Sequence, residues 1–362
     1  MKVTMQIPTE PIGSIPRPLY LQDAMNDAAN GRIPIEQQQS ATDRALRETI
    51  ELFEATGSPV ITDGEQAKPS FATYPVHGCA NIAPGGATIP FADGHTRQLP
   101  RLTAGPFRYA TYAASFVTAA KSLTKTPIKQ AVISASALSL LYPQDGIASY
   151  SHEQFLEDLI SEAEKDIRGC LEAGADNVQI DFTEGRLAIK LDPSLKLLEH
   201  FIALNNRVLE CFSQDERLRI GVHSCPGGDH DSTHSADIGY DNLLPRLFQL
   251  KATNFYIQLA SERDRRPVLE LVRANLRSNQ RIFVGVTDPI NPRLETAEEV
   301  CSRVLEAAES IPLHQLGTTD DCGFSPFADD ISTSRELAFQ KIRARVSGTA
   351  LASQRLHGGD RM

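Results

Sequence analysis

The chain has 362 residues, 41% of them hydrophobic, and 36 basic against 46 acidic residues give it a formal net charge of -10. No basic run is long enough to follow a phosphate backbone and no apolar run approaches the roughly 18 residues of a membrane span, which argues against nucleic-acid and membrane partners. The first eight residues lack the apolar stretch of a signal peptide, and the six cysteines lack the spacing of a disulfide framework. We therefore expect a cytoplasmic protein with free thiols.

Short β-branched runs alternate with longer helical patterns along most of the chain. The predicted strands cover residues 3–7, 59–62, 130–134, 177–181, 218–222, 254–258, 282–286 and 314–317. A helix is predicted from Phe155 to Leu171, where apolar residues recur at the three-and-four spacing of one buried face. This alternation predicts an α/β protein with one (β/α)₈ TIM barrel over residues 1–350. A doubly wound open sheet is the alternative, but no Gly-rich strand-to-helix turn supports it.

One stretch, at about residues 75–105, breaks the alternation. Its Gly and Pro residues separate short β-prone pieces between Ala83 and Leu102. This pattern predicts a β-hairpin inserted after the second strand, on the rim of the barrel or folded across it as a lid. Residues 351–362 are predicted to form a C-terminal tail.

Three soft metal ligands follow predicted strands. His223 and Cys225 come after the fifth strand, and Cys322 comes after the eighth. In a barrel these positions share one rim, so one imidazole nitrogen and two thiolates could hold zinc and leave a fourth position open, as in catalytic sites. The expected fourth ligand is a substrate thiol, which zinc would deprotonate. Alternatively, these residues belong to the core.

Acidic residues reach the same rim. Glu65 follows the second strand, Asp181 the fourth and Asp288 the seventh. Glu65 and Asp181 could pair with the α-ammonium group of an amino acid, while Glu184 either joins the site or forms a surface pair with Arg186.

A loop rich in Gly and His directly follows Cys225, over residues 227–234. It is either a solvated loop or a substrate-facing loop in which His230 or His234 supplies a proton donor or ligand. Asp288 and His230 are our candidate catalytic residues.

Six motifs stand in the order found in one known family: Ile12-Gly13-Ser14-Ile15-Pro16, Asp63-Gly64-Glu65, Val178-Gln179-Ile180-Asp181, His223-Ser224-Cys225, Gly285-Val286-Thr287-Asp288 and Asp321-Cys322-Gly323. The chain thus resembles the catalytic barrel of cobalamin-independent methionine synthase, in a single-barrel form. The resemblance implies a zinc-dependent methyltransferase that moves a methyl group from a folate to homocysteine. It also implies that His223, Cys225 and Cys322 bind zinc, and that substrate is held by Gly13, Ser14, Glu65 and Asp181.

Three departures from the family pattern bear on the chemistry. Gln258 stands where the family has a glutamate near the zinc, so it is expected to contact substrate or, weakly, the metal. Ile290 stands where a proton-donating histidine is expected, and the chain has no tryptophan to support a pterin.

These departures leave the methyl donor open. A folate, a corrinoid protein, another methyl donor or a different electrophile would each be compatible with the rest of the pattern. Alternative functions are a zinc enzyme that joins a thiol to an epoxide, a metal-free barrel of the porphyrin-decarboxylase type, and a non-catalytic binder of metal or thiol.

Overall fold

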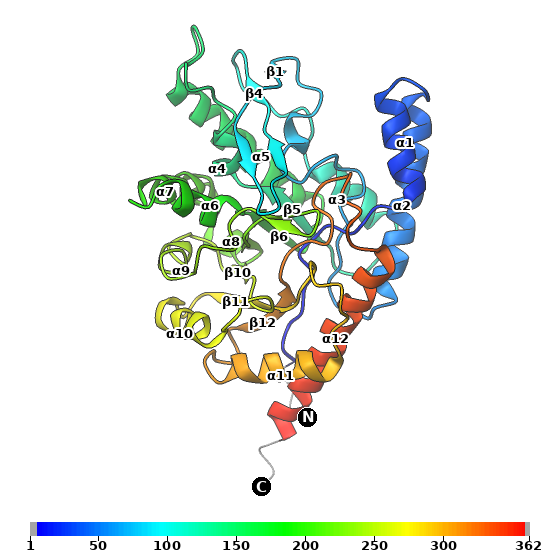
Figure 1. Cartoon of the computed structure of the whole chain (residues 1–362), viewed down its shortest axis with the longest axis vertical. Coiled ribbons are helices and arrows are strands. Elements are labelled where there is room, and N and C mark those ends of the chain that lie inside the picture. Colours follow the sequence, from blue (N-terminus) through cyan, green and yellow to red (C-terminus); the bar gives the residue numbers. More distant parts are fainter. Residues whose placement is uncertain (1–5, 359–362) are drawn as a thin grey trace.

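The computed structural model describes residues 6–358, and its centre is a parallel sheet with the strand order β12, β11, β10, β7, β6, β5 (Figure 1). The strands are β5 (Lys129–Ile133), β6 (Asn177–Asp181), β7 (Ile220–Ser224), β10 (Asn254–Ile257), β11 (Arg281–Thr287) and β12 (Leu316–Asp320). Six of the predicted strands are therefore confirmed, with small shifts at their ends. Nearly all their residues are buried, as expected for a parallel sheet covered by helices.

Two short segments extend this sheet at its edges. Thr9 pairs in parallel with Thr318 of β12, and Ile61 pairs in parallel with Ile128, next to β5. Each of these pairings is a single bridge, so neither segment is a regular strand. The predicted strand at residues 3–7 lies largely outside the described residues.

These two segments meet each other and close the barrel. The Thr62 hydroxyl donates to the carbonyl oxygen of Gly13 at 2.7 Å, and the Ile15 amide donates to the carbonyl oxygen of Gly64 at 3.0 Å. The predicted barrel is thus confirmed, with six regular strands and two bridging segments.

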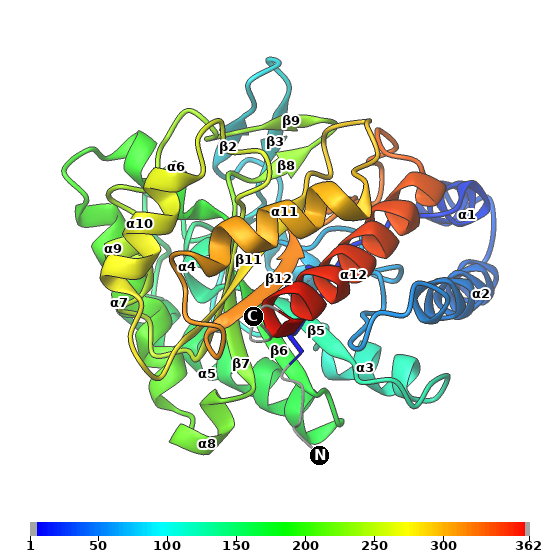
Figure 2. The ribbon, with the colours of Figure 1, turned by 90° about the horizontal axis from the view of Figure 1, so that it is seen from below.

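Helices surround the barrel (Figures 1 and 2). They are α1 (Leu19–Ala29), α2 (Ile35–Glu54), α3 (Ala114–Lys121), α4 (Ala135–Ser139), α5 (His152–Glu172), α6 (Glu184–Leu191), α7 (Lys196–Glu210), α8 (Gln214–Arg217), α9 (Leu244–Leu247), α10 (Arg266–Asn275), α11 (Ala297–Ala308) and α12 (Arg335–Gly358), with one short 3-10 helix, η1 (Tyr74–Val76). In Figure 2, α11 and α12 lie side by side. Because α12 continues to Gly358 and buries Ala352, the tail predicted from residue 351 is helical as far as the structure describes it.

The predicted helix from Phe155 to Leu171 is part of α5, and residues in the sequence account for where this helix begins and ends. Ser151 and Gln154 form a reciprocal capping box at its start, and Gly174, with φ +93°, follows its end. Its buried face includes Phe155 and Leu159, both 0% exposed. Full burial of each such side chain contributes about 1.5–3 kcal/mol.

The predicted insertion is a pair of nested antiparallel ladders. Its outer ladder joins β1 (Ile82–Ala83) to β4 (Arg101–Leu102), and its inner ladder joins β2 (Thr88–Pro90) to β3 (Thr96–Gln98). The hairpin expected here is therefore confirmed.

A second small hairpin follows β7 and consists of β8 (Gly228–Asp229) and β9 (Ser232–Thr233). The Ala92 amide of the insertion donates to the carbonyl oxygen of Thr233 at 2.9 Å. The insertion is thereby attached to the rim that carries the predicted metal ligands.

Candidate active site

The three predicted metal ligands come together at the carboxyl ends of β7 and β12. The candidate ligand atoms of His223, Cys225 and Cys322 all lie within 4.8 Å of one another, and the two sulfur atoms are 3.1 Å apart. His223 and Cys225 are each 1% exposed. Among residues 6–358 this is the only group of three or more His, Cys, Asp or Glu side chains positioned to hold a metal ion.

The hydrogen bonding of His223 leaves one ring nitrogen available to a metal. Its Nδ1 lies 3.2 Å from the carbonyl oxygen of Tyr256, and a carbonyl oxygen can only accept, so Nδ1 carries the proton. The other nitrogen, Nε2, is buried without a hydrogen-bond partner in the described structure. A buried lone pair beside two thiols is what a metal site requires.

The thiols also fit a cation. The neighbouring Cys225 side chain, together with burial, raises the pKa of the Cys322 thiol well above its ordinary value. A divalent cation between the sulfurs would favour both thiolates. One nitrogen and two sulfurs suit a soft or borderline metal ion.

An inner cavity adjoins this cluster and contains predicted substrate-binding residues from distant parts of the chain. It is lined, among others, by Ser14, Glu65, Asp181, His223 and Cys322. The predicted Gly13 lies beneath it, because a Cβ atom there would sit 3.3 Å from Glu65 Oε1. The sequence-predicted carboxylates and metal ligands therefore share one space.

Glu65 is held in a strained backbone conformation, with φ +56°. Its Oε1 accepts a hydrogen bond from Lys68 Nζ at 3.2 Å, while its Oε2 is buried without a partner in the described structure. Arg17 fixes this turn by donating to the carbonyl oxygens of Glu65 and Lys68, both at 2.7 Å. Burial raises the pKa of Glu65 to about 7, so a cationic ligand would favour its ionised form.

Asp181 is the last residue of β6 and lines the inner cavity. Its Oδ1 accepts from Gln179 Nε2 at 2.7 Å, and burial raises its pKa. The ammonium group of Lys68 acts on both Glu65 and Asp181, and that of Lys129 also acts on Asp181. Because Glu65 Oε2 has no partner in the described structure, the inner cavity is suited to a ligand that brings a further positive charge.

A second space, the rim cavity, lies beside the two thiols. It has a volume of about 220 Å³, and Cys225, Cys322, Gln258, Asp288 and Ile290 are among its lining residues. Gln258 Nε2 donates to Ser261 Oγ at 2.6 Å, so the amide is oriented by the protein. Gln258 and Asp288 therefore lie near the cluster, although no contact with a metal or substrate follows from their positions alone.

Two acidic residues beside the rim cavity accept hydrogen bonds from backbone amides. Asp288 Oδ1 accepts from the Ile290 amide at 3.0 Å, and burial raises the pKa of Asp288. Asp321, which belongs to the Asp321-Cys322-Gly323 motif but had no predicted role, accepts from the amides of Leu259 at 2.8 Å and Ser261 at 2.7 Å. It thereby fixes the chain that carries Gln258, and its neighbour Cys322 with it.

His230 lies in the turn between β8 and β9 and lines neither the inner cavity nor the rim cavity. Its Nε2 is 3.1 Å from Arg97 Nη2, and its Nδ1 is 3.8 Å from Asp330 Oδ1. Its predicted catalytic role stays a prediction. His234, the alternative in the same loop, lines a third space under the insertion, the outer cavity, which His230 does not line.

Arg97 links the insertion to the rim of the barrel, and we call its contacts there the latch. Its guanidinium donates to Asp229 Oδ1 at 3.0 Å and to Asp329 Oδ2 at 2.9 Å, and it lies 4.3 Å above the ring of Phe327. These contacts join β3 to the loops after β7 and β12. The sequence offers no signal for this latch, because its members are far apart in the chain.

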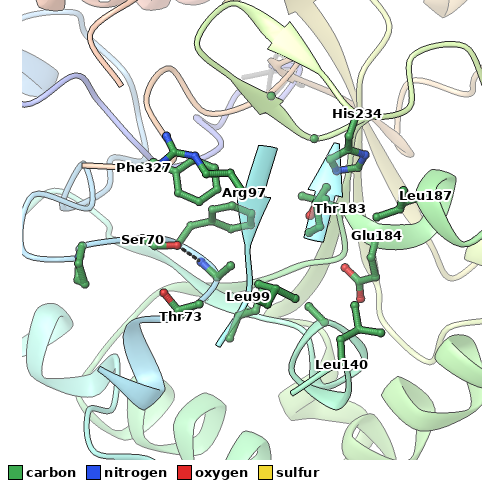
Figure 3. Close-up of a pocket in the computed structure, with 18 of the residues that line it drawn as sticks. Ser70, Thr73, Arg97, Leu99, Leu140, Thr183, Glu184, Leu187, His234 and Phe327 are labelled. Carbon is green, nitrogen blue, oxygen red and sulfur yellow. Dashed lines mark hydrogen bonds between the residues drawn. The ribbon is translucent and has the colours of Figure 1, made fainter. Parts of the chain in front are cut away.

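The outer cavity, of about 390 Å³, lies under the insertion (Figure 3). Its lining includes Phe71, Ile89, Phe91, Arg97, Leu99, Leu140, Thr183, Glu184, Leu187, His234 and Phe327. Arg97 and Phe327 lie at one end in Figure 3, and Glu184 and Leu187 lie at the other. The outer cavity shares Phe71 and Thr183 with the inner cavity, so the two spaces adjoin.

Glu184 does not form the surface pair that the sequence suggested. It is 5% exposed, and its Oε1 accepts from the Ser134 hydroxyl at 2.6 Å and from the Ser136 hydroxyl. Arg186 is 1% exposed and pairs instead with Glu262 at 2.6 Å. Burial raises the pKa of Glu184 to about 7.

None of the helices in the described part of the chain is both long enough and apolar enough to cross a membrane.

Comparison with known proteins agrees with this architecture. Residues 7–334 match the model of the family described as "Cobalamin-independent synthase, Catalytic domain". A methionine synthase of Saccharolobus solfataricus is 22% identical over 359 residues, covering 97% of this chain and 96% of its own.

Solved structures show the same fold. A B12-independent methionine synthase from Shewanella sp. W3-18-1, in complex with selenomethionine, aligns with a TM-score of 0.77 at 19% identity and covers 98% of this chain and 100% of its own. A putative B12-independent methionine synthase from Listeria monocytogenes gives a TM-score of 0.71 at 22% identity and covers 95% of this chain and 98% of its own. The chain belongs to the cobalamin-independent methionine synthase family, a family of methyltransferases.

Proposed function

We propose that the protein is a zinc-dependent thiol S-methyltransferase that methylates homocysteine to methionine. The observation that carries this proposal is the unpaired Nε2 of His223 beside the thiols of Cys225 and Cys322. This donor set matches catalytic zinc sites that keep one position open. When bound, zinc would lower the pKa of a substrate thiol and leave a nucleophilic sulfur.

The inner cavity supplies the contacts for the amino-acid end of homocysteine. The unpaired Glu65 Oε2 and the buried carboxylate of Asp181 would bind the α-ammonium group through charge-assisted hydrogen bonds. Because both side chains are fixed by Lys68 and Gln179, they would hold the thiol in one orientation toward His223 and Cys322.

The relatives support this substrate assignment. The matching Saccharolobus protein is named a methionine synthase, and the Shewanella structure contains selenomethionine, the selenium analogue of the proposed product. The roles of Gly13, Ser14 and Gln258 in substrate binding, and of Asp288 in catalysis, remain predictions. A folate or a corrinoid protein as methyl donor also remains a prediction.

Comparing the binding of homocysteine and homoserine tests the proposal, because homocysteine has a thiol where homoserine has a hydroxyl group. Calorimetry on zinc-loaded protein should show homocysteine binding at least about tenfold tighter, with release of the thiol proton. A matched titration of metal-stripped protein should lose this preference. Equal affinity for the two compounds in the zinc-loaded protein would contradict thiol activation.

A further inference from the structure

The proposed function needs a second substrate, the methyl donor, next to the inner cavity, and two spaces adjoin that cavity. The rim cavity shares Cys322 and Gly323 with it, and the outer cavity shares Thr183 and Gly227 with it. The linings of these two spaces differ in charge and polarity. This difference decides which space suits an organic methyl donor.

The rim cavity is the more acidic of the two. Among residues 6–358, those that line it include five aspartates and no Lys, Arg or His. The aspartates are Asp229, Asp231, Asp288, Asp321 and Asp330. A methyl donor with carboxylate groups, such as a folate, would be repelled by this lining.

The outer cavity is larger and mainly apolar. Its volume of about 390 Å³ falls in the range of ligand pockets, about 300–1,000 Å³. Its apolar lining residues are Phe71, Ile89, Phe91, Leu99, Ile133, Ala137, Leu140, Leu187 and Phe327. A largely apolar heterocycle therefore suits this space better than the rim cavity.

His234 reaches the outer cavity from the loop after β9, and its hydrogen bonds determine which ring nitrogen carries the proton. Its Nδ1 lies 2.7 Å from Ser235 Oγ, and Ser235 Oγ donates its one proton to the carbonyl oxygen of Pro226 at 3.1 Å. Because that proton is used on a carbonyl oxygen, which can only accept, Nδ1 carries its own proton and donates to Ser235 Oγ. Nε2 is then the nitrogen with a free lone pair.

The position of Nε2 is the junction of the outer and inner cavities. The His234 ring packs edge to face against Phe91 at 5.6 Å, and it lies at the edge of the outer cavity in Figure 3. It also packs against Gly227, where a Cβ atom would lie 1.8 Å from Nε2. Gly227 lines both cavities, so Nε2 lies where the two substrates would meet.

The imidazole of His234 is a permanent acceptor at physiological pH. Burial and the nearby ammonium group of Lys190 lower the pKa of His234 to about 4. Among residues 6–358, the only hydrogen bond of this ring is that of Nδ1. An acceptor without a partner in a mainly apolar space is unfavourable, and an N–H group of a ligand would satisfy it.

We propose that the outer cavity binds the methyl donor, and that His234 is a specificity-determining residue whose Nε2 accepts a hydrogen bond from an N–H group of that donor. The assignment rests on the proposed function, because it requires a thiol acceptor in the inner cavity. The ligand class is a neutral nitrogen heterocycle with at least one N–H group. The reduced pterin ring of a methyl-folate has this chemistry.

Matched probes isolate the hydrogen bond to His234. Indole and benzofuran have the same shape, but only indole carries an N–H group. Calorimetry on the zinc-loaded full chain should show indole binding tighter by about fivefold, the effect of one hydrogen bond between neutral groups. Equal affinity for the two compounds would overturn the proposal.

Two variants locate that preference at His234. His234→Phe keeps a ring beside Phe91 but removes both nitrogens, and should abolish the preference for indole. His234→Gln keeps an acceptor oxygen and should retain part of the preference. The exposed His200→Gln is the control and should retain all of it. A preference that persists unchanged in His234→Phe would overturn the assignment of this residue.

Binding of 5-methyltetrahydrofolate then connects the outer cavity to the reaction. This compound should displace indole, and its dissociation constant should rise by about fivefold in His234→Phe, whereas the affinity for homocysteine should not change. Binding without displacement of indole, equal binding to wild type and His234→Phe, or no binding at all would each overturn the proposal and leave the proposed function intact. Failure of zinc-loaded protein to bind homocysteine would instead reject the proposed function, whatever the indole result.

Discussion

Tyr256 determines which nitrogen of His223 can bind a metal. The two residues are paired neighbours on β10 and β7, and the Tyr256 carbonyl oxygen lies 3.2 Å from His223 Nδ1. The Tyr256 ring is held below the site by stacking on Phe283 at 4.6 Å and by its hydroxyl, which donates to Glu10 at 2.6 Å. A packed barrel interior therefore orients the ligand before any metal binds.

Substitution of Cys322 by Ser should remove zinc and thiol transfer together, because a hydroxyl is a poor substitute for a thiolate ligand. Zinc content, measured by mass spectrometry after gel filtration, should fall from stoichiometric to background. The exposed Cys211→Ser is the matched control and should retain zinc. Full metal content in Cys322→Ser would rule out the three-ligand assignment.

Substitution of Gln258 by Glu should add a negative charge beside the two thiols, with which Gln258 shares the rim cavity. Homocysteine should then bind more weakly as a thiolate, but the bound sulfur should be alkylated faster, each by severalfold, because it becomes more electron-rich. Rates of alkylation by methyl iodide at saturating homocysteine would measure this. The exposed Gln37→Glu, outside all three cavities, is the control. Unchanged rates would mean that charge at this position does not limit the reaction.

The affinity for L-methionine should rise with pH, because this ligand has an ammonium group but no thiol. Burial raises the pKa of Glu65 to about 7, so the carboxylate that would bind the ammonium forms mainly above that pH. The dissociation constant should fall by up to about tenfold per pH unit below pH 7 and then level off.

Two variants test this pH dependence. Glu65→Gln should weaken binding and flatten the profile, whereas Glu184→Gln, whose carboxylate lies in the outer cavity, should retain it. A steep profile in Glu65→Gln would contradict the role of Glu65.

In ligand-free protein the raised pKa of Glu65 affects stability in the opposite direction. The free energy of unfolding falls as pH rises from 4.5 to about 7, because the folded state holds this proton more tightly than the unfolded chain does.

Substitution of Arg97 by Met should destabilise the fold by about 2–3 kcal/mol, because it leaves the buried carboxylate of Asp229 with only imidazole partners, such as His95 Nε2 at 3.0 Å. Urea unfolding measures this change. Asp329→Asn removes the partner whose side chain is 63% exposed, and should cost less than about 1 kcal/mol. A larger loss in Asp329→Asn than in Arg97→Met would show that the latch does not depend on the buried pair.

Much of the fold could be predicted because the central strands and α5 carry strong local patterns. The segments at Thr9 and Ile61 could not be located as accurately, because each makes a single bridge. A proline also precedes each of them closely: Pro8 lies next to Thr9, and Pro59 lies two residues before Ile61. Proline has no amide hydrogen for a ladder, so a regular strand does not extend through it. Closure of the barrel depends instead on individual hydrogen bonds between the two segments, from the Thr62 hydroxyl and the Ile15 amide.

The convergence of His223, Cys225 and Cys322 could be predicted because residues that follow parallel strands meet at one rim. Three other features could not be predicted from the sequence: the latch formed by Arg97, the burial of Glu184, and the hydrogen bonds by which Asp321 holds the chain that carries Gln258. Each depends on partners distant in the chain, and a charged residue gives no local sign that it will be buried.

The most direct test of the central claim is the X-ray absorption spectrum of the zinc-loaded protein before and after addition of homocysteine. The account predicts one nitrogen and two sulfur ligands from the protein, with a third sulfur appearing when homocysteine binds. A spectrum that retains two sulfurs at saturating homocysteine would contradict thiol activation at this site, and failure to bind zinc would reject the metal centre itself.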